Sequence, residues 1–547
     1  MASTKIIPVS PNGPSALKLA KSFKMSKMSK RSTGVKTDLK DSPEKHLIQT
    51  KGYQPGKLIL YFLGISMTIG GSFISWNLSL STGFYGYLVM YIIMGLGYVT
   101  FCLCISEVTS ALPFAGGAYG LARCTLGFFP AFVIGCCETL EYVASVAVQA
   151  VCVADIAALG VPLLASYKPL LWLLFYVHTT VTQCFGGRWF WWTVSLLGAS
   201  QVALLLVYNF GILSEVNIKN NAAIHPPLRF AGGVSEALHV FPYFSWFFLG
   251  VEAMNLASDE VKTPRSQIPA AQVSTVCTLF LVGLMTSITT VALWRDYELH
   301  TLIKTFTPLD RGFAHVFDIN PSEVVLLTLP SQYAGGYGLH WASAKLLYSL
   351  GASKLLPTWL ANTSARFGTP HMAILTSSVC GYGVCLLVFY YPVSTGYLFP
   401  VCLLFAFTSY AGQCIGYISL KVNYPMARQS KFKNPLGIYG AVYALIVWCI
   451  GIAAVLGFQG HRGGELVLFG ITLAFLALYY KLCAKKRQTM SKEESKVLMV
   501  AHIARFNMNR MSKTSTSGGS NHTSRSKNTK RRSEEGQRSK NANTDMM

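Results

Sequence analysis

Long apolar segments recur along the chain, and they constrain its fold more than any other feature of the sequence. A helix needs about 20 apolar residues to cross the hydrocarbon core of a bilayer, which is about 30 Å thick. Twelve segments meet this requirement, and eight of them contain no Asp, Glu, Lys or Arg. They are 58–82, 84–106, 126–157, 169–187, 189–213, 237–257, 268–294, 324–349, 371–391, 393–420, 435–458 and 464–483. Since the strands of a membrane barrel have only about 10 residues of alternating polarity, the pattern predicts an all-α membrane protein with about 12 transmembrane helices.

Most of the net positive charge lies in two tails outside these segments. The net charge is +23 over 547 residues; residues 1–57 hold 12 Lys or Arg against 3 Asp or Glu, and residues 484–547 hold 15 against 5. Tails rich in Ser and Lys without apolar periodicity are expected to be disordered, and here they flank a membrane domain at 58–483. Because Lys and Arg next to spans stay in the cytosol, we expect both termini there. We expect an integral multi-pass protein of the plasma membrane, with the lipid bilayer and not a nucleic acid as its partner.

The sequence contains no pattern typical of a metal site, a cofactor or a nucleotide. The 14 cysteines lie almost wholly inside the predicted spans, and no Cys/His spacing is typical of a metal site. The Gly-x-x-x-x-Gly-Lys-Ser/Thr loop of ATP-driven proteins is absent from the sequence. We therefore predict no metal, no cofactor and no enzymatic activity. A coupling ion, either H⁺ or Na⁺, stays open.

Glycines interrupt two of the apolar segments near mid-depth. Residues 70–72 (Gly-Gly-Ser) lie in the middle of 58–82, and Gly250 lies at a similar depth in 237–257. An unwound stretch exposes backbone N–H groups that attract a carboxylate. Glycine-interrupted segments in corresponding positions indicate a binding site, although glycine pairs also permit close helix packing. We predict a substrate site formed by Gly70, Gly71, Ser72, Phe247, Leu249 and Gly250.

Acidic residues at membrane depth are a second indicator of function, because they are costly there and usually face a cavity or a partner. Glu138 and Glu141 are three residues apart, so they share one face of the helix predicted at 126–157. Glu252 follows the second glycine break. We predict that Glu252 and Glu138 are gating or proton-linked residues, and that one acid of the helix at 126–157 is protonated or binds a cationic group of the substrate. A purely structural brace is the alternative role for Glu252.

Three motifs in the chain resemble those of a known family. From Glu107 to Arg123 an acidic residue precedes a Pro-x-x-Gly-Gly-x-Tyr turn. Residues 248–264 contain Phe-x-Gly-x-Glu followed by Glu-x-x-x-Pro, and residues 355–371 contain Leu-Pro-x-x-Leu followed by Thr-Pro. Together and in this order, the motifs resemble the signature of the amino acid–polyamine–organocation transporter superfamily.

The resemblance implies a LeuT-type fold, which is an inverted five-plus-five helix repeat with two accessory helices. The repeats would be 58–213 and 237–420, and the accessory helices would lie in 435–483. The resemblance also implies a secondary transporter, or permease, that moves amino acids or related small amines by alternating access. Trp246 aligns with the aromatic residue that closes over the substrate in the bacterial arginine–agmatine antiporter, so the resemblance implies that Trp246 belongs to the substrate site and to its gate. Glu141 roughly aligns with a substrate-contacting position there, so the resemblance implies that Glu141 contacts the substrate.

The resemblance leaves alternatives for the substrate and partners. Residues 75–77 (Ser-Trp-Asn) and 138–142 are similar to the ethanolamine-permease branch, so an ethanolamine or polyamine permease is an alternative. That branch tends to carry an acid where this chain has Ser72, which favours an amino acid over ethanolamine. A cation-coupled transporter or a channel of another substrate class is a further alternative. Exchangers linked to a heavy chain use a cysteine that residues 160–168 lack, so we expect no disulfide-linked partner.

Overall fold

Every regular element in the described part of the computed structural model is a helix. The structure describes residues 53–222, 230–293, 299–423, 430–459, 463–491 and 494–495. Most of the two predicted tails, 1–57 and 484–547, therefore lies outside the described residues.

Among these residues, eight helices are long and apolar enough to cross a membrane, and one bent pair brings the number to nine. The eight are α3 (Phe84–Ala111), α5 (Phe128–Gly160), α7 (Gly187–Gly211), α10 (Pro264–Leu293), α15 (His371–Tyr390), α16 (Thr395–Asn423), α17 (Gly437–Phe458) and α18 (Gly464–Tyr479), which continues through η13 (Tyr480–Ala484) and α19 (Lys485–Arg487). The other three predicted segments are helical but broken or more polar: α6 (Lys168–Phe185), α9–η6–η7 (Gly233–Val240, Phe241–Phe247, Val251–Asp259) and α14 (Leu329–Ala352). The predicted all-α, multi-pass fold is confirmed.

The bent pair is the first predicted span. Its first part along the chain, α2 (Lys57–Thr68) with η2 (Ile69–Ser72), meets its second part, η3 (Trp76–Thr82), at an angle of 49°. A second break separates η6 from η7, where Gly250 has a φ of 99°. A side chain in this left-handed region would be strained, whereas glycine adopts it freely. Both glycine-interrupted segments are therefore broken close to the glycines.

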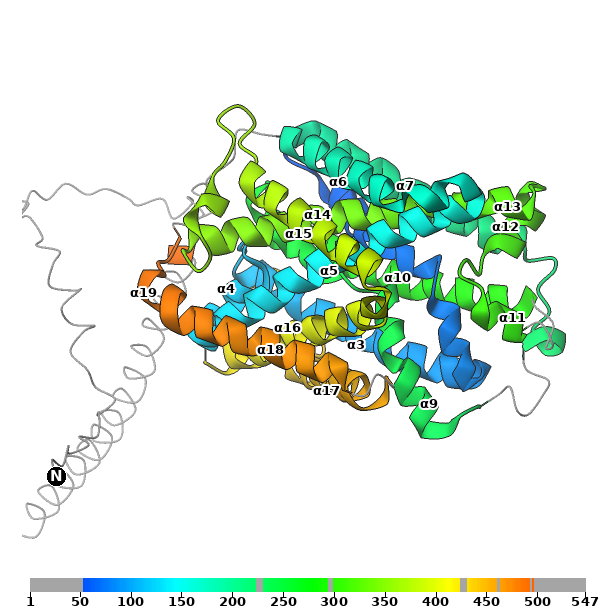
Figure 1. Ribbon diagram of the computed structural model, residues 1–547. Helices are drawn as coiled ribbons and strands as arrows, with labels where there is room; N and C mark the ends of the chain where they lie inside the picture. The colour runs from blue at the N-terminus through cyan, green and yellow to red at the C-terminus, as the bar shows by residue number, and fades with distance from the viewer. Residues whose placement is uncertain are drawn as a thin grey trace, which may run out of the picture. The chain divides into compact units, whose positions relative to one another are not determined.

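Helices that hold the same position in the two predicted five-helix repeats pack against each other (Figure 1). Helix α3 packs on α10, α5 on α14 and α6 on α15, and the first break, η2 and η3, contacts η6. Pairing of equivalent helices is what two repeats related by a two-fold axis would give. The division into repeats at 58–213 and 237–420 stays a prediction.

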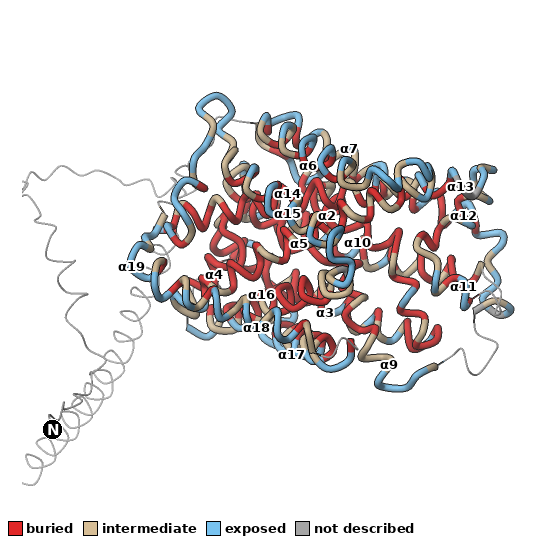
Figure 2. The backbone as a smooth tube through the Cα atoms, viewed as in Figure 1, coloured by how far each residue is buried: buried red, intermediate tan, exposed pale blue. Residues whose placement is uncertain are grey.

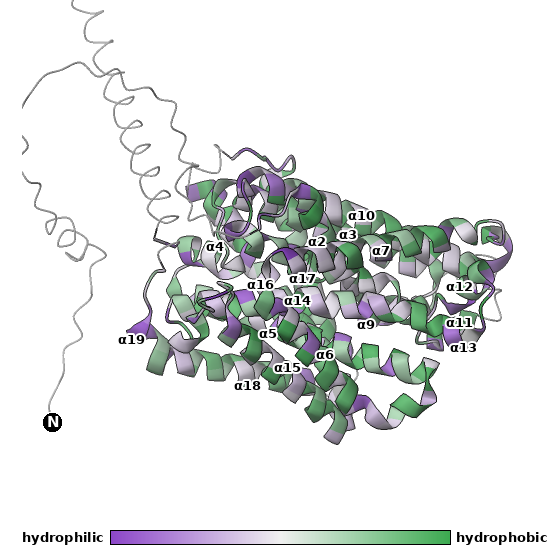
Figure 3. Cartoon of the chain, turned by 90° about the horizontal axis from the view of Figure 1, so that it is seen from above, coloured by the Kyte–Doolittle hydropathy of each residue, from purple (hydrophilic) through white to green (hydrophobic). Residues whose placement is uncertain are grey.

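The outer surface of the helix bundle is apolar in a way that suits a bilayer. Figure 2 shows the buried backbone in the middle of the bundle, and Figure 3 shows apolar residues along the outer helices. Large apolar side chains on α18 are exposed, among them Val467, Ile471 and Phe475. Exposed apolar surface of this extent on helices of spanning length indicates contact with lipid. The chain is an integral multi-pass membrane protein.

Short helices of the described residues mark the two ends of the bundle (Figure 1). Helix α4 (Gly117–Thr125), η10 (Thr358–Ala361) and α19 lie at one end, which we call the α4 end. Helices α11 (Leu299–Lys304), α12 (Asp310–Phe317) and α13 (Pro321–Val324) lie at the opposite end, the α11 end.

The loop that carries α11 and α12 is fastened to the first broken span. The amide nitrogen of Asn77, in η3, donates hydrogen bonds to the carbonyl oxygens of Leu302 at 2.6 Å and Thr305 at 2.7 Å. Asp310 begins α12, and its carboxylate accepts a hydrogen bond from the hydroxyl of Thr307. Burial raises the pKa of the Asp310 carboxyl from 3.8 to about 6.

The raised pKa of Asp310 predicts that this loop is more stable in acid. Because the folded loop holds the Asp310 proton more tightly than the unfolded loop, its stability falls as the pH rises from about 4 to about 6 and levels off above that. Hydrogen exchange of residues 299–317, corrected for intrinsic rates, should show greater protection at pH 5 than at pH 7.5. Asp310→Asn should remove this difference.

The matched control for this measurement is Asp318→Asn, since Asp318 is exposed and its φ of 51° suits asparagine. This variant should keep the pH dependence of the parent chain. Equal protection of the parent chain at both pH values would contradict the role given to Asp310.

Candidate functional site

The two broken spans meet where both backbones leave regular helical geometry. A Cβ atom on Gly71 would lie only 2.0 Å from the carbonyl oxygen of Trp246 and 2.5 Å from its carbonyl carbon. Only glycine permits this approach of η2 to η6 without displacing backbone. Close packing and an unwound backbone, which the sequence left as alternative roles for the glycines, therefore occur together.

Polar groups around this contact are buried, and only some of their donors and acceptors make hydrogen bonds to the described residues. The amide nitrogen of Gln332, on α14, donates to the carbonyl oxygen of Gly70 at 2.9 Å. The hydroxyl of Ser72, the indole nitrogen of Trp246 and the amide oxygen of Gln332 are buried and have no hydrogen-bond partner among the residues that the structure describes. We call Gly70, Gly71, Ser72, Trp246 and Gln332 the break site. Unused buried polar atoms are rare in folded proteins, so the break site has a free capacity to bind a polar ligand or water.

The other predicted residues of η6 and the second break serve packing. The ring of Phe247 lies edge-on to Tyr91 at 5.0 Å, and Leu249 is buried in the same apolar cluster. Gly250 allows the chain to turn into η7 beside Leu339, whose side chain would lie 2.7 Å from an added Cβ atom. Trp246 itself lies edge-on to Phe399, on α16, at 5.0 Å.

The three predicted glutamates are brought together by two tyrosines, and we call these five residues the acid cluster. The hydroxyl of Tyr142 donates to Glu252 at 2.9 Å and lies 3.3 Å from Glu138. The hydroxyl of Tyr410, on α16, donates to Glu141 at 2.5 Å. Glu138 also accepts a hydrogen bond from the backbone N–H of Ala118 at 2.8 Å. Helices α5, η7, α16 and the start of α4 thus meet at one set of carboxyl groups.

The acid cluster has no cation among the described residues. All three carboxyl groups are fully buried, and one oxygen each of Glu141 and Glu252 has no hydrogen-bond partner. Lys345, the one Lys or Arg of α14, pairs instead with Asp259 at 2.8 Å and Glu260 at 2.6 Å. An unpaired buried carboxylate costs several kcal/mol, so the cluster has to hold protons or receive a cation.

The break site and the acid cluster use different helices. The break site is formed by η2, η6 and α14, whereas the acid cluster is formed mainly by α5, η7 and α16. They are linked along the chain, because Trp246 of the break site and Glu252 of the acid cluster lie on either side of the break at Gly250.

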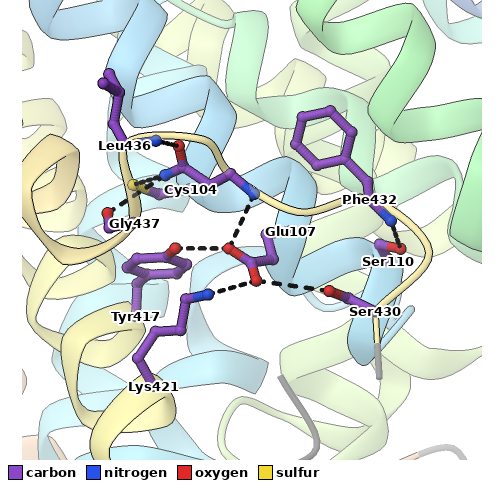
Figure 4. A network of polar contacts seen from close by, with 10 residues as sticks. Cys104, Glu107, Ser110, Tyr417, Lys421, Ser430, Phe432, Leu436 and Gly437 are labelled. Carbon is purple, nitrogen blue, oxygen red and sulfur yellow. Dashed lines mark hydrogen bonds and ion pairs between the residues drawn. The ribbon is translucent and has the colours of Figure 1, made fainter. Parts of the chain in front are cut away.

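A fourth buried acid, Glu107, is fully paired, and the sequence analysis used it only as part of a motif. Glu107, near the end of α3, pairs with Lys421 at 2.5 Å and accepts hydrogen bonds from the hydroxyl of Tyr417 at 2.6 Å and the backbone N–H of Asn434 at 3.2 Å (Figure 4). The network fastens α3 to the end of α16 and to the segment before α17. Its partners lie more than 300 residues away along the chain, and nothing in the sequence pairs them.

A second ion pair missed by the sequence lies at the α4 end. Arg123 of α4 pairs with Glu494 at 2.8 Å, and both side chains are almost fully buried. Glu494 also accepts a hydrogen bond from the hydroxyl of Ser353 at 2.6 Å, and the backbone N–H of Thr489 donates to the carbonyl of Ser353 at 3.0 Å. The ordered chain therefore extends past the predicted boundary at 484 and joins α4 to the loop after α14.

The described residues contain no candidate metal site and no disulfide bond. No group of three or more His, Cys, Asp or Glu is placed there to hold a metal ion. All 14 cysteines are free.

Comparison with known families identifies this arrangement of broken helices. The model of the amino acid permease family matches residues 58–491, which include both breaks and the acid cluster. The chain belongs to the amino acid permease family. This confirms the resemblance to the amino acid–polyamine–organocation superfamily, and the chain is a membrane permease and not an enzyme.

Several curated permeases and transporters are similar to this member of the family. An uncharacterised transporter of Rhizobium meliloti is 24% identical over 58% of this chain and 70% of its own length. A histidine permease of Lactococcus lactis is 24% identical over 56% of this chain and 68% of its own length. An S-adenosylmethionine permease of Candida albicans is 25% identical over 71% of this chain and 66% of its own length. The names of these relatives do not favour the ethanolamine or polyamine alternative.

Two neighbouring glycines of the break site give a matched pair for testing its geometry. Gly71→Ala should destabilise the permease by about 1–3 kcal/mol through overpacking, because its Cβ atom meets the backbone of Trp246. Gly70→Ala should cost less, since its Cβ atom meets mainly the side-chain amide of Gln332 at 3.1 Å. The thermal stability of both purified variants measures the difference. If Gly71→Ala were as stable as Gly70→Ala, the two breaks would not touch as described.

Proposed function

We propose that this permease carries a zwitterionic or cationic amino acid by alternating access, with the break site and the acid cluster as two halves of one substrate site. The observation that carries the proposal is that, among the described residues, the buried acid cluster has no cation and three buried polar atoms of the break site have no hydrogen-bond partner. An amino acid brings complementary groups to both, a carboxylate and at least one cation.

The break site suits the substrate carboxylate. Backbone N–H groups at the start of a helical segment carry partial positive charge and bind anions. Here the helix start at the break belongs to η3, which begins at Trp76, whereas Gly71 and Ser72 end η2 on the other side of the break. The unpartnered hydroxyl of Ser72 and indole N–H of Trp246 add two further hydrogen-bond donors. Ser72 is neutral, so it does not repel a carboxylate at this place.

Glu141 is the residue that we assign to the cationic group of the substrate. One of its oxygens is held by Tyr410 and the other is buried without a partner. Glu252 and Glu138, which share the hydroxyl of Tyr142, are assigned to proton exchange during the cycle. Neighbouring buried carboxyl groups cannot all stay ionised without a cation, so a proton would move when the substrate cation arrives or leaves.

The names of two relatives support this substrate class. Histidine and S-adenosylmethionine, named for the Lactococcus lactis and Candida albicans permeases, are both amino acids, with a side chain that is or can become cationic. A bare amine such as ethanolamine would leave the N–H groups of the break site without a partner.

We propose that the α4 end faces the cytosol and that both termini lie there, in a plasma-membrane protein. This orientation places Arg123, Lys354 and the run Lys485–Arg487 on the cytosolic side, as the positive-inside rule expects. In the same proposal, residues 58–213 and 237–420 are the two repeats, 435–483 holds the accessory helices, and no heavy chain is attached through a disulfide.

Uptake by proteoliposomes tests the assignment of Glu141. Glu141→Gln should raise the KM for arginine about tenfold, which corresponds to a loss of about 1.4 kcal/mol, and change the KM for alanine much less. Glu215→Gln, at an exposed position, is the matched control and should change neither value. An equal effect of Glu141→Gln on both substrates would contradict a contact with the side-chain cation.

The same vesicles test the substrate class and the proton-linked residues. Unlabelled amino acids should compete for uptake strongly and ethanolamine weakly, and Glu252→Gln should flatten the dependence of uptake on pH. If ethanolamine competed best and amino acids not at all, the interpretation of the break site would be wrong. A full pH response in Glu252→Gln would leave Glu252 a structural brace.

A further inference from the structure

A cavity of about 590 Å³ lies at the α4 end, away from the break site and the acid cluster. It opens between the loop after α14 and the segment from the end of α18 to α19. Its walls include Lys354, Thr358, Trp359, Tyr479, Cys483 and Arg487. The volume is within the range of about 300–1,000 Å³ found for small-molecule sites.

The charge of this cavity is positive. Lys354 and Arg487 line it from opposite sides, no Asp or Glu lies in its walls, and neither cation has an acidic partner among the described residues. Lys354 also has a φ of 55°, a conformation that costs energy for any residue with a side chain. The cavity is therefore suited to an anion.

The position of the cavity indicates where that anion comes from. Along the outer face of α18 and η13, the apolar side chains of Leu478 and Leu482 are exposed. The chain then changes to the cations of Lys485–Arg487. Such a change from apolar to basic residues marks the level of the lipid headgroups. Trp359 and Tyr479 have the amphipathic rings that favour the same level.

We propose that this cavity binds the headgroup of an anionic phospholipid, with Lys354 and Arg487 on its phosphate and with Trp359 and Tyr479 against its glycerol and upper acyl region. This site goes beyond the proposed transport function and needs neither the break site nor the acid cluster.

A bound headgroup would also fasten the chain after α19. Lys354 directly follows Ser353, and Arg487 lies two residues before Thr489. The hydrogen bond from Thr489 to Ser353 and the pair Arg123–Glu494 hold this segment against the bundle. A phosphate that contacts both cations would bridge the same two parts of the chain, so the lipid should stabilise the fold.

The test uses the purified full-length permease in a neutral detergent. Dioctanoyl phosphatidylserine is the probe, dioctanoyl phosphatidylcholine is the zwitterionic comparison, and inorganic phosphate is the free anion. Thermal unfolding is followed as each is titrated. We expect a saturable rise in melting temperature with phosphatidylserine and little change with the other two.

Two double variants with the same loss of charge separate this site from general attraction of anions. Lys354→Gln with Arg487→Gln should weaken the apparent affinity for phosphatidylserine at least about tenfold, which equals about 1.4 kcal/mol. Lys481→Gln with Lys485→Gln changes exposed cations outside the cavity and should weaken it less than about twofold. The melting temperature of each variant without lipid reports whether it is folded.

Three results would overturn the proposal. Equal weakening by the two double variants would indicate diffuse attraction of anions to the α4 end. An equal response to phosphatidylcholine would remove the need for charge, and an equal response to inorganic phosphate would make the cavity a free-anion site and not a lipid site. None of these results bears on the uptake assays, so failure here and failure of the transport proposal are distinguishable.

Discussion

Backbone that leaves helical geometry at membrane depth loses its hydrogen bonds, and it has to recover them from side chains, a ligand or water. Two such breaks meet in this permease. Their contact depends on Gly71, which lets η2 approach the backbone of Trp246, and on Gln332, which reaches from α14 to the carbonyl of Gly70. The polar atoms that stay unused at this contact are what make it a candidate binding site and not only a packing defect.

The buried acids of the molecule differ in how their charge is balanced. Glu107 pairs with Lys421 and Glu494 pairs with Arg123, so each of these two acids has a cation beside it and braces the α4 end. Glu138, Glu141 and Glu252 receive only hydroxyl and amide donors from the described residues. The paired acids therefore hold parts of the fold together, whereas the carboxyl groups of the acid cluster need protons or a substrate cation to balance their charge. This difference separates structural from functional carboxyl groups more clearly than burial does, because all five are buried.

The sequence predicted the helices, the two breaks and the three glutamates, because apolar length, glycine position and charge at membrane depth are local features. It did not predict that Tyr142 and Tyr410 would hydrogen-bond to the glutamates. Nor did it predict the ion pairs Lys421–Glu107 and Arg123–Glu494, whose members lie far apart along the chain. Phe247 and Leu249 pack into the apolar core. The direction of a side chain next to a break depends on η6, a 3₁₀ helix with fewer residues per turn than an α-helix. Residue spacing in the sequence does not show where the chain changes from one period to the other, so it does not predict these directions.

The central claim is that one amino acid bridges the break site and the acid cluster. A structure of the purified permease with saturating arginine, at a resolution that separates carboxylate from guanidinium, tests it most directly. The account predicts that the substrate carboxylate lies against the backbone of Gly71 and Ser72 and that the guanidinium lies beside Glu141. Arginine bound elsewhere, with Glu141 still held only by Tyr410, would contradict the account.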